Sequence, residues 1–246
     1  MSTLPQTALI TGASRGIGRA TALRLARLGM QVVVGYNSDA AAAEAVVAEM
    51  AGDGHMACRI SIEDAASVSA AMAEITARFG RLDVLVNSGG STTPVPAGDL
   101  DALSDDMFDS VLRINLRGPF AVIRAARPLL EQSDAAVIVN VSSLSAKTGI
   151  GSNLAYCAAK GGLDTLTLGL ARVLGPKIRV FSVSPAGVAT DFVAGRTPED
   201  LQARAAATPL QKVTMPDDVA RAIEGAITHL TSSTGIALMV DEGRHL

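Results

Sequence analysis

The sequence predicts an α/β protein built as a doubly wound parallel sheet of about seven strands, with helices on both faces. Its 246 residues alternate short, nearly continuous apolar runs with longer Ala-rich stretches of helical periodicity. Strands without polar positions are typical of parallel sheets that helices cover on each side. Hydrophobic residues make up 48% of the chain and charged residues 18%, which excludes a disordered chain.

Strands and helices are expected in regular alternation. The strands are expected over residues 7–11, 31–36, 55–60, 82–87, 135–141, 178–183 and 236–240, where aliphatic and β-branched residues run together. The helices are expected over residues 16–28, 39–50, 64–79, 104–130 and 154–174, and a last helix opens at Pro216. Ser104 is a candidate N-cap, and Gly29 is a candidate helix end.

No linker, repeat or low-complexity segment divides the chain, so a single domain over residues 1–246 is expected. Residues 190–214 are the longest stretch without a clear helix or strand, and a movable lid is expected there. Sheets of this kind bind ligands at the carboxyl ends of their strands. The residues that follow each strand are therefore the candidate functional positions.

The composition excludes several classes of function. A net charge of −3, with 3% aromatic residues and no Trp, excludes a basic or base-stacking nucleic-acid binder. No apolar run reaches the roughly 18 residues of a membrane span, and residues 1–7 leave no room for a signal peptide. The two cysteines, Cys58 and Cys157, favour a cytoplasmic protein. The three histidines lack metal-ligand spacing, so no metal is expected.

A glycine-rich loop, Thr11-Gly-Ala-Ser-Arg-Gly-Ile-Gly18, joins the first strand to the first helix. Gly12, Gly16 and Gly18 allow a tight turn and a close approach of the backbone to a pyrophosphate, which then meets the positive end of the helix. An ordinary glycine turn is the alternative. The strand–turn–helix context in the first unit favours a Rossmann-type dinucleotide site.

The residues after the second strand favour NADP(H) over NAD(H). Sites for NAD place an Asp or Glu about 20 residues past the loop to bind the adenine ribose. Here the strand is followed by Asn37 and Ser38, and Arg15 in the glycine loop can reach a 2′-phosphate. Asp39 would favour NAD(H) if the strand ended later, so NAD(H) stays open.

Tyr156 and Lys160 lie four residues apart in a predicted helix and therefore share one helical face. An ammonium beside a phenol stabilises the phenolate, which makes a tyrosine a usable proton donor and acceptor. Taken alone, the pair is also common on protein surfaces. Ser143 follows the fifth strand and can present a hydroxyl to a substrate oxygen, with Ser142 as the rival. Either serine could instead serve a turn.

Together these motifs resemble the short-chain dehydrogenase/reductase superfamily over essentially the whole chain. Residues 11–18 are similar to its coenzyme loop, residues 87–90 (Asn-Ser-Gly-Gly) to its Asn-Asn-Ala-Gly motif, and residues 184–190 to its Pro-Gly segment beside the nicotinamide. Residues 234–243 are similar to its C-terminal signature. Its Asn-Ser-Tyr-Lys tetrad falls on Asn115, Ser143, Tyr156 and Lys160.

The resemblance implies a role for each residue of the tetrad. Tyr156 would be the general acid–base, and Lys160 would lower its pKa and bind the nicotinamide ribose. Ser143 would bind the substrate oxygen, and Asn115 would support a proton relay through water. Coenzyme contacts are expected at Gly12, Ser14, Arg15, Gly16, Ile17, Gly18, Asn37, Ser38, Ser61, Ile62, Asn87, Ser88, Gly89, Tyr156, Lys160, Pro185, Gly187, Val188 and Thr190.

Three positions depart from the family pattern. Ser61-Ile62 stands in place of an Asp-Val pair beside the adenine, Ala186 stands in place of a Gly, and Ser88 with Gly90 alters the motif after the fourth strand. The Ala186 departure predicts a shifted loop after the sixth strand. None of the three touches the tetrad, so activity is expected.

The expected function is that of an NADP(H)-dependent oxidoreductase that interconverts a carbonyl group and a secondary alcohol of a small molecule. An NAD-dependent polyol or sugar dehydrogenase and a non-catalytic dinucleotide-binding regulator are the alternatives. The family also implies a homotetramer. The substrate walls are expected in residues 91–95, 144–154 and from 186 past 196, without one diagnostic charge.

The chain also resembles 3-oxoacyl-(acyl-carrier-protein) reductases. Arg124, Arg127, Arg172 and Lys177 could form a basic patch for an acyl carrier protein, although a solvated face is the simpler interpretation.

Overall fold

The computed structural model describes residues 7–195 and 197–246, and its centre is one seven-stranded sheet in the order β3-β2-β1-β4-β5-β6-β7. All neighbouring strands are parallel, which confirms the predicted fold class. The strands are β1 (Thr7–Thr11), β2 (Gln31–Tyr36), β3 (Met56–Arg59), β4 (Val84–Asn87), β5 (Ala136–Val141), β6 (Ile178–Pro185) and β7 (Ile236–Val240).

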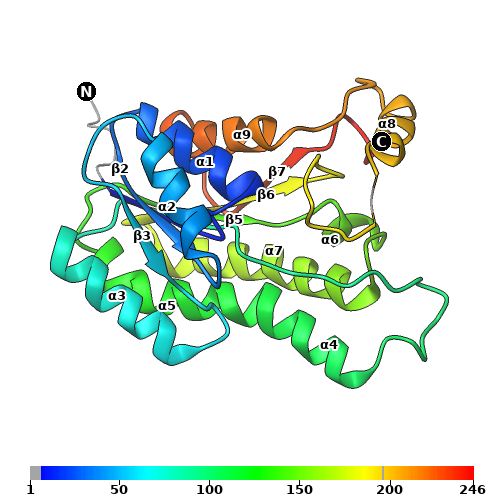
Figure 1. The fold of residues 1–246 in the computed structure, drawn as a ribbon, viewed down its shortest axis with the longest axis horizontal. Helices are drawn as coiled ribbons and strands as arrows, with labels where there is room; N and C mark the ends of the chain where they lie inside the picture. Colours follow the sequence, from blue (N-terminus) through cyan, green and yellow to red (C-terminus); the bar gives the residue numbers. More distant parts are fainter. Residues whose placement is uncertain (1–6, 196) are drawn as a thin grey trace.

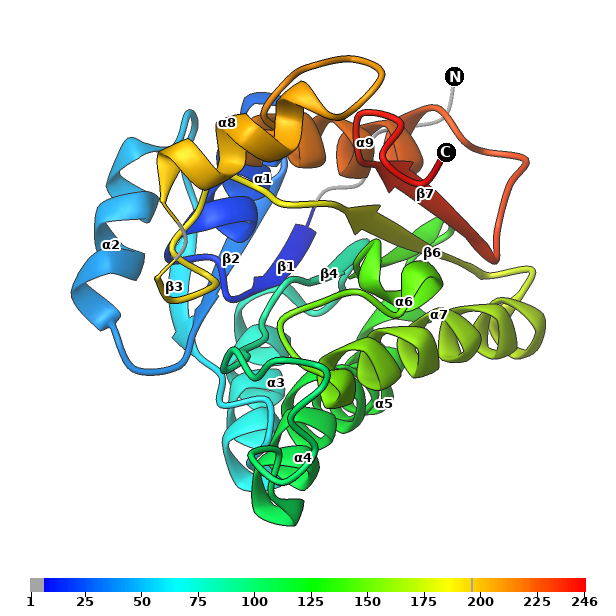
Figure 2. The same cartoon turned by 90° about the vertical axis from the view of Figure 1, so that its right-hand side faces the viewer.

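Helices cover both faces of the sheet, as Figures 1 and 2 show. One face packs against α1 (Gly16–Arg27), α2 (Ala40–Glu49) and α9 (Pro216–Thr228). The other packs against α3 (Ala65–Phe79), α5 (Gly118–Leu130) and α7 (Leu154–Leu174). Because β1, β4 and β5 are buried along their whole length, most of their side chains are apolar on both faces, and the buried Asn87 and Asn140 hydrogen-bond to each other.

The predicted helix over residues 104–130 is interrupted. It consists of α4 (Asp105–Leu112), a π-helical turn η1 (Arg113–Arg117) and α5. Ser104 is the N-cap of α4, as predicted, and its hydroxyl accepts from the Met107 amide at 3.3 Å. Asn115 lies inside the π-turn, where its side chain bonds the Val111 carbonyl at 3.0 Å. Such turns widen a helix locally and occur often at functional sites.

The stretch over residues 190–214 contains a helix that the sequence interpretation did not include. This helix is α8 (Pro198–Ala206), and Thr197 begins it with a capping box. A second unexpected element is the single turn α6 (Ser145–Thr148) after β5. The expectations of a movable lid and of one domain over residues 1–246 stay predictions. Arg196 and residues 1–6, where the absence of a signal peptide was expected, lie outside the described residues.

The topology determines where a ligand can bind. The chain reaches one edge of the sheet at β3 and then crosses back to place β4 beside β1. Connections that run in opposite directions from two neighbouring strands leave a crevice at the carboxyl ends of those strands. No helix in residues 7–195 or 197–246 combines the length and apolar character that a membrane span requires.

Candidate active site

A cavity of about 1440 Å³ opens at the carboxyl ends of the strands, between the loops that follow β1 to β6 and the helix α8. Nearly all predicted site residues line it: Gly12, Ser14, Arg15, Gly16, Ile17, Gly18, Asn37, Ser38, Ser61, Ile62, Ser88, Gly89, Ser143, Tyr156, Lys160, Pro185, Gly187, Val188 and Thr190. Asn87 and Asn115 do not line the cavity wall.

The glycine loop leaves no room for larger residues. Gly12 has φ +64°, and a Cβ on it would lie 2.8 Å from the Gly89 Cα. A Cβ on Gly18 would lie only 2.4 Å from the Gly12 carbonyl oxygen. Thr190 reaches the loop from the other side, because a Cβ on Gly16 would meet its Cγ2 at 3.4 Å. The backbone at the start of α1 carries no side chains that would block a ligand, and the loop with Thr190 covers it. This arrangement fits the pyrophosphate of a dinucleotide.

The adenosine end of the cavity carries no free carboxylate after β2. The strand ends at Tyr36 as predicted, and Asn37 and Ser38 line the cavity. Asp39 is the N-cap of α2, with its carboxylate accepting from the Ala42 amide at 2.9 Å. The Asp39 carboxylate is therefore used to cap its own helix.

Two arginine side chains lie in or near the wall at this end of the cavity. Arg15 is exposed in the cavity wall and has no ion pair among the residues that the structure describes. The Arg59 guanidinium, at the end of β3, donates to the Asn37 carbonyl at 3.2 Å. Arg59 was not singled out from the sequence, although it lies within the third predicted strand (residues 55–60), and parallel pairing places it beside Tyr36.

The departures from the family pattern leave the cavity wall intact. Ser61 and Ile62 both line the cavity, and the Ser61 amide donates to the Ser67 hydroxyl at 2.9 Å. Ala186 has no left-handed backbone conformation, and its amide donates to the Val240 carbonyl at 3.1 Å. That bond continues the pairing of β6 with β7 for one more residue, so Ala186 needs none of the freedom of glycine.

Tyr156 and Lys160 lie in the first two turns of α7, as predicted. Asn153 is the N-cap of this helix and accepts from the Tyr156 amide at 2.7 Å. The Lys160 Nζ lies 5.6 Å from the centroid of the Tyr156 ring, and it donates to the Val141 carbonyl at 2.8 Å. Burial lowers the pKa of Lys160 to about 8, although Asp164 acts in the opposite direction.

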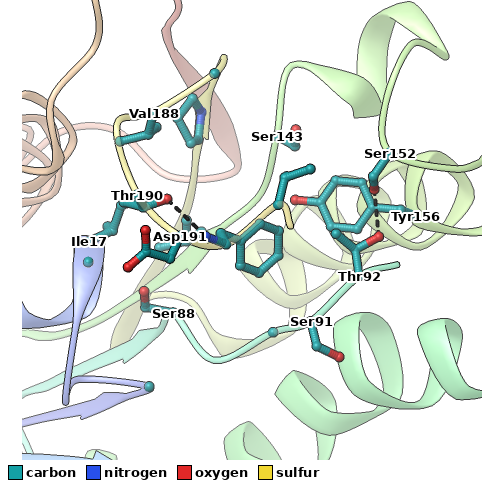
Figure 3. A pocket seen from close by; sticks show the side chains of 18 of the residues that line it. Ile17, Ser88, Ser91, Thr92, Ser143, Ser152, Tyr156, Val188, Thr190 and Asp191 are labelled. Carbon is teal, nitrogen blue, oxygen red and sulfur yellow. Dashed lines mark hydrogen bonds between the residues drawn. The ribbon is translucent and has the colours of Figure 1, made fainter. Parts of the chain in front are cut away.

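The structure distinguishes the two candidate serines. The Ser142 hydroxyl donates to the Lys160 carbonyl at 3.3 Å and is buried against α7. The Ser143 hydroxyl bonds the Ser145 hydroxyl at 3.1 Å and stays in the cavity wall. Figure 3 shows the Tyr156 ring reaching into the same cavity, with its hydroxyl on the side of Ser143. Both serines line the cavity, but the Ser142 hydroxyl donates into α7, which makes Ser143 the stronger candidate to meet a substrate oxygen.

Asn115 and Asn87 are held by the protein itself. The Asn115 amide group donates to the Ser91 carbonyl at 2.7 Å as well as to Val111, which fastens the segment after β4 to the π-turn. The Asn87 side chain donates to the Asn140 side chain at 2.9 Å. The proton-relay role of Asn115 stays a prediction. Both asparagines lie outside the cavity wall and stabilise the segments next to it.

The substrate side of the cavity comes from the predicted walls and from a residue that the sequence interpretation missed. Thr92 and Ser152 hydrogen-bond across the entrance at 2.5 Å (Figure 3), and the Phe192 ring lies 6.0 Å from the Tyr156 ring. Leu201, Gln202 and Arg204 on α8 fall within the wall expected past residue 196, whereas Arg244 in the C-terminal turn was missed. The Thr-Pro-Glu-Asp start signal was the available sequence signal for α8.

The exposed basic residues Arg124, Arg127, Arg172 and Lys177 do not line the cavity. Arg127 pairs with Glu131 at 2.7 Å, as on an ordinary solvated helix face.

Comparisons with known proteins agree with this geometry. Residues 12–245 match the family model described as enoyl-(acyl carrier protein) reductase. The chain is 34% identical over 223 residues to the 3-oxoacyl-(acyl-carrier-protein) reductase FabG of Staphylococcus aureus (strain Mu50), with 89% of each chain covered. It is 38% identical over 188 residues to the D-threitol dehydrogenase of Mycolicibacterium smegmatis, covering 75% of this chain and 71% of that protein.

A crystal structure of a dehydrogenase/reductase from Sinorhizobium meliloti superposes with a TM-score of 0.90 at 34% identity, covering 100% of this chain and 97% of the other. The sequence motifs, the fold and the cavity that brings the predicted site residues together all support the same family. The chain belongs to the short-chain dehydrogenase/reductase family and is an oxidoreductase that acts on carbonyl and alcohol groups.

Proposed function

We propose that this protein is an NADP(H)-dependent oxidoreductase that interconverts a carbonyl group and a secondary alcohol of a small molecule. The observation that carries the proposal is the meeting of Tyr156, Ser143 and Lys160 with the glycine loop in one cavity. The glycine loop fits the pyrophosphate of a nicotinamide dinucleotide, which supplies or accepts the hydride when bound. The protein supplies orientation and the proton.

The proton moves at the Tyr156 hydroxyl. In the reducing direction the phenol gives its proton to the carbonyl oxygen of the substrate as the C–O double bond becomes a single bond, and the product is the alcohol. Ser143 donates a hydrogen bond to the same oxygen and holds it in place. The Lys160 ammonium stabilises the phenolate that remains. In the oxidising direction the phenolate takes the proton back from the alcohol.

The preference for NADP(H) rests on charge at the adenosine end. Arg15 lines the cavity, Arg59 bonds Asn37, and Asp39 is engaged as a helix cap. A 2′-phosphate would meet the Arg15 guanidinium in the cavity wall. Fluorescence titration should show NADPH binding at least about tenfold tighter than NADH. Asn37→Asp should reverse this order by repelling the phosphate, and unchanged affinities would contradict the assignment.

The reaction itself is tested by an absorbance screen at 340 nm with small ketones, polyols, sugars and acyl thioesters. Tyr156→Phe should lower kcat by a factor of about 100 or more on any substrate found, because the proton donor is lost. Full turnover by that variant would refute the role of Tyr156. Because one relative acts on D-threitol, polyols with NAD⁺ form the second arm. Coenzyme binding without any turnover would support a regulator instead.

We also propose a homotetramer in the cytoplasm. Phe120 on α5, with Leu168 and Val173 on α7, is 39–73% exposed, and such apolar side chains at helix surfaces suit contact with a second copy. Cys58 and Cys157 are both unpaired thiols, as in a reducing compartment. Light scattering of the purified protein tests the assembly, and a monomer would contradict it. Docking of an acyl carrier protein stays a prediction.

A further inference from the structure

Two arginines on the substrate side have no part in the mechanism described above. Arg204 lies on α8, and Arg244 lies in the turn after β7. Both line the cavity, and both are exposed. Within the described part of the chain, neither guanidinium has an ion pair or a side-chain hydrogen bond. Exposed arginines inside a cavity, with no partner of the protein's own, are available to a ligand.

The backbone holds these two arginines at the same side of the cavity. The segment that follows α8 packs on the C-terminal turn: the Leu210 amide donates to the Glu242 carbonyl at 3.2 Å. Gly243 has φ +79°, and a Cβ on it would meet Pro209 at 2.8 Å. Both ribbon views show this turn beside the end of α8 (Figures 1 and 2). Because a side chain at Gly243 would clash with Pro209, the glycine allows the C-terminal turn to pack closely on the segment that follows α8.

The neighbouring carboxylates are already engaged by the protein. Asp200 accepts from the backbone amide that begins α8 at 3.0 Å. Asp241 is buried and accepts from the His245 ring at 2.8 Å, and Glu242 accepts from the Thr214 hydroxyl at 3.2 Å. These carboxylates keep their charge, but among the residues that the structure describes none of them pairs with Arg204 or Arg244.

Apolar side chains line the same cavity as the arginines. The Phe192 ring centroid lies 6.0 Å from that of Tyr156, and Leu201 lies one helical turn before Arg204 on α8. The cavity thus offers a substrate the tyrosine hydroxyl, apolar surface and two positive charges.

We propose that Arg204 and Arg244 together bind an oxyanion, a carboxylate or a phosphate, at the end of the substrate remote from its carbonyl group. The guanidinium fork matches both anions with paired N–H donors. The inference rests on the proposed function and makes it more specific, because it names the substrate class as ketones with an apolar middle and an anionic end.

The test compares three ketones that share one apolar chain and differ at the far end: a carboxylate, its primary amide and a phosphate monoester. For the wild-type protein, kcat/KM for an anionic ketone should exceed that for the amide by about tenfold, mostly through KM. Arg204→Ala combined with Arg244→Ala should remove this preference by lowering kcat/KM for the anionic ketones to the value for the amide. Arg172→Ala, an equally exposed arginine outside the cavity, is the matched control and should keep the preference.

The carboxylate and phosphate arms show which anion the pair prefers. Equal kcat/KM for all three ketones in the wild type, or a preference that survives in the double variant, would overturn the inference. Calorimetric titration with the corresponding carboxylate and amide alcohols decides the same point without turnover. If no ketone reacts but the carboxylate alcohol binds about tenfold tighter through the arginines, the site stands and the proposed reaction fails. Equal binding of both alcohols overturns the site.

Discussion

Replacing Lys160 by methionine should stabilise the folded protein while it removes activity. Lys160 is 5% exposed, and its ammonium donates to the Val141 carbonyl at 2.8 Å. Burial lowers its pKa from 10.5 to about 8, against the opposing charge of Asp164. The folded protein therefore holds a charge that it would lose readily, and the fold itself gains little from that charge.

The magnitude follows from the two pKa values. The difference between 10.5 in the unfolded chain and about 8 in the folded protein corresponds to about 3 kcal/mol of lost stability at pH 7. Methionine has a similar length and no charge, so it removes this penalty. It also removes the hydrogen bond to Val141, which is worth about 1–2 kcal/mol. The free energy of unfolding of Lys160→Met should therefore exceed that of the wild type by about 1–2 kcal/mol.

The direction in which this stability difference changes with pH is also predicted. Between pH 8 and pH 10.5 the unfolded chain binds more protons at Lys160 than the folded protein does, so the wild type gains stability there as the pH rises. The advantage of the variant should shrink from pH 7 to pH 10. Urea unfolding followed by circular dichroism measures it, with Lys177→Met as the control at an exposed lysine. A variant that is less stable at pH 7, or an advantage that does not change with pH, would refute the reasoning.

Two further substitutions test the coenzyme loop and the charge next to Lys160. Gly18→Ala places a Cβ 2.4 Å from the Gly12 oxygen, about 1 Å inside van der Waals contact, so the Kd for NADPH should rise at least about tenfold. Gly225→Ala, in α9, should leave that Kd unchanged, because Gly225 has no positive φ and its Cβ would meet nothing within 4 Å. Asp164→Asn removes the charge that raises the pKa of Lys160, so the alkaline decline of kcat/KM should move down by about half a pH unit. An unchanged profile would show that Lys160 does not control this limb.

Much of the sheet could be predicted because burial on both faces demands apolar residues without interruption. The exceptions to the predicted strand limits have local causes. Residues 82–87 were expected as one strand, but β4 begins at Val84. Asp83 is buried there, and its carboxylate accepts the Thr7 amide at 2.9 Å and the Ser133 hydroxyl at 2.7 Å. A side chain thus replaces part of the backbone pairing, and the apolar pattern does not reveal such an exchange.

Two of the errors in the helices differ in kind. The start of α8 carries a Thr-Pro-Glu-Asp signal, so this helix could have been predicted if the capping residues had been weighed above its weak apolar pattern. The π-turn at Asn115 depends on the Ser91 carbonyl, 24 positions away in the chain. No local pattern can reveal a turn that a distant backbone group stabilises.

The two sides of the cavity likewise differ in how far the sequence reveals them. The coenzyme side is built from backbone at close approach, where Gly12 and Gly18 admit no other residue, so its residues are recognisable in the sequence. The substrate side is built from side chains of separate loops, of α8 and of the C-terminal turn, and nothing in the coenzyme side constrains them. Relatives with the same family fold accordingly carry the names of a 3-oxoacyl-(acyl-carrier-protein) reductase and a D-threitol dehydrogenase. Substrate choice in this chain therefore has to be sought in residues such as Arg204 and Arg244, because the roles proposed for Tyr156, Ser143 and Lys160 make no distinction among carbonyl compounds.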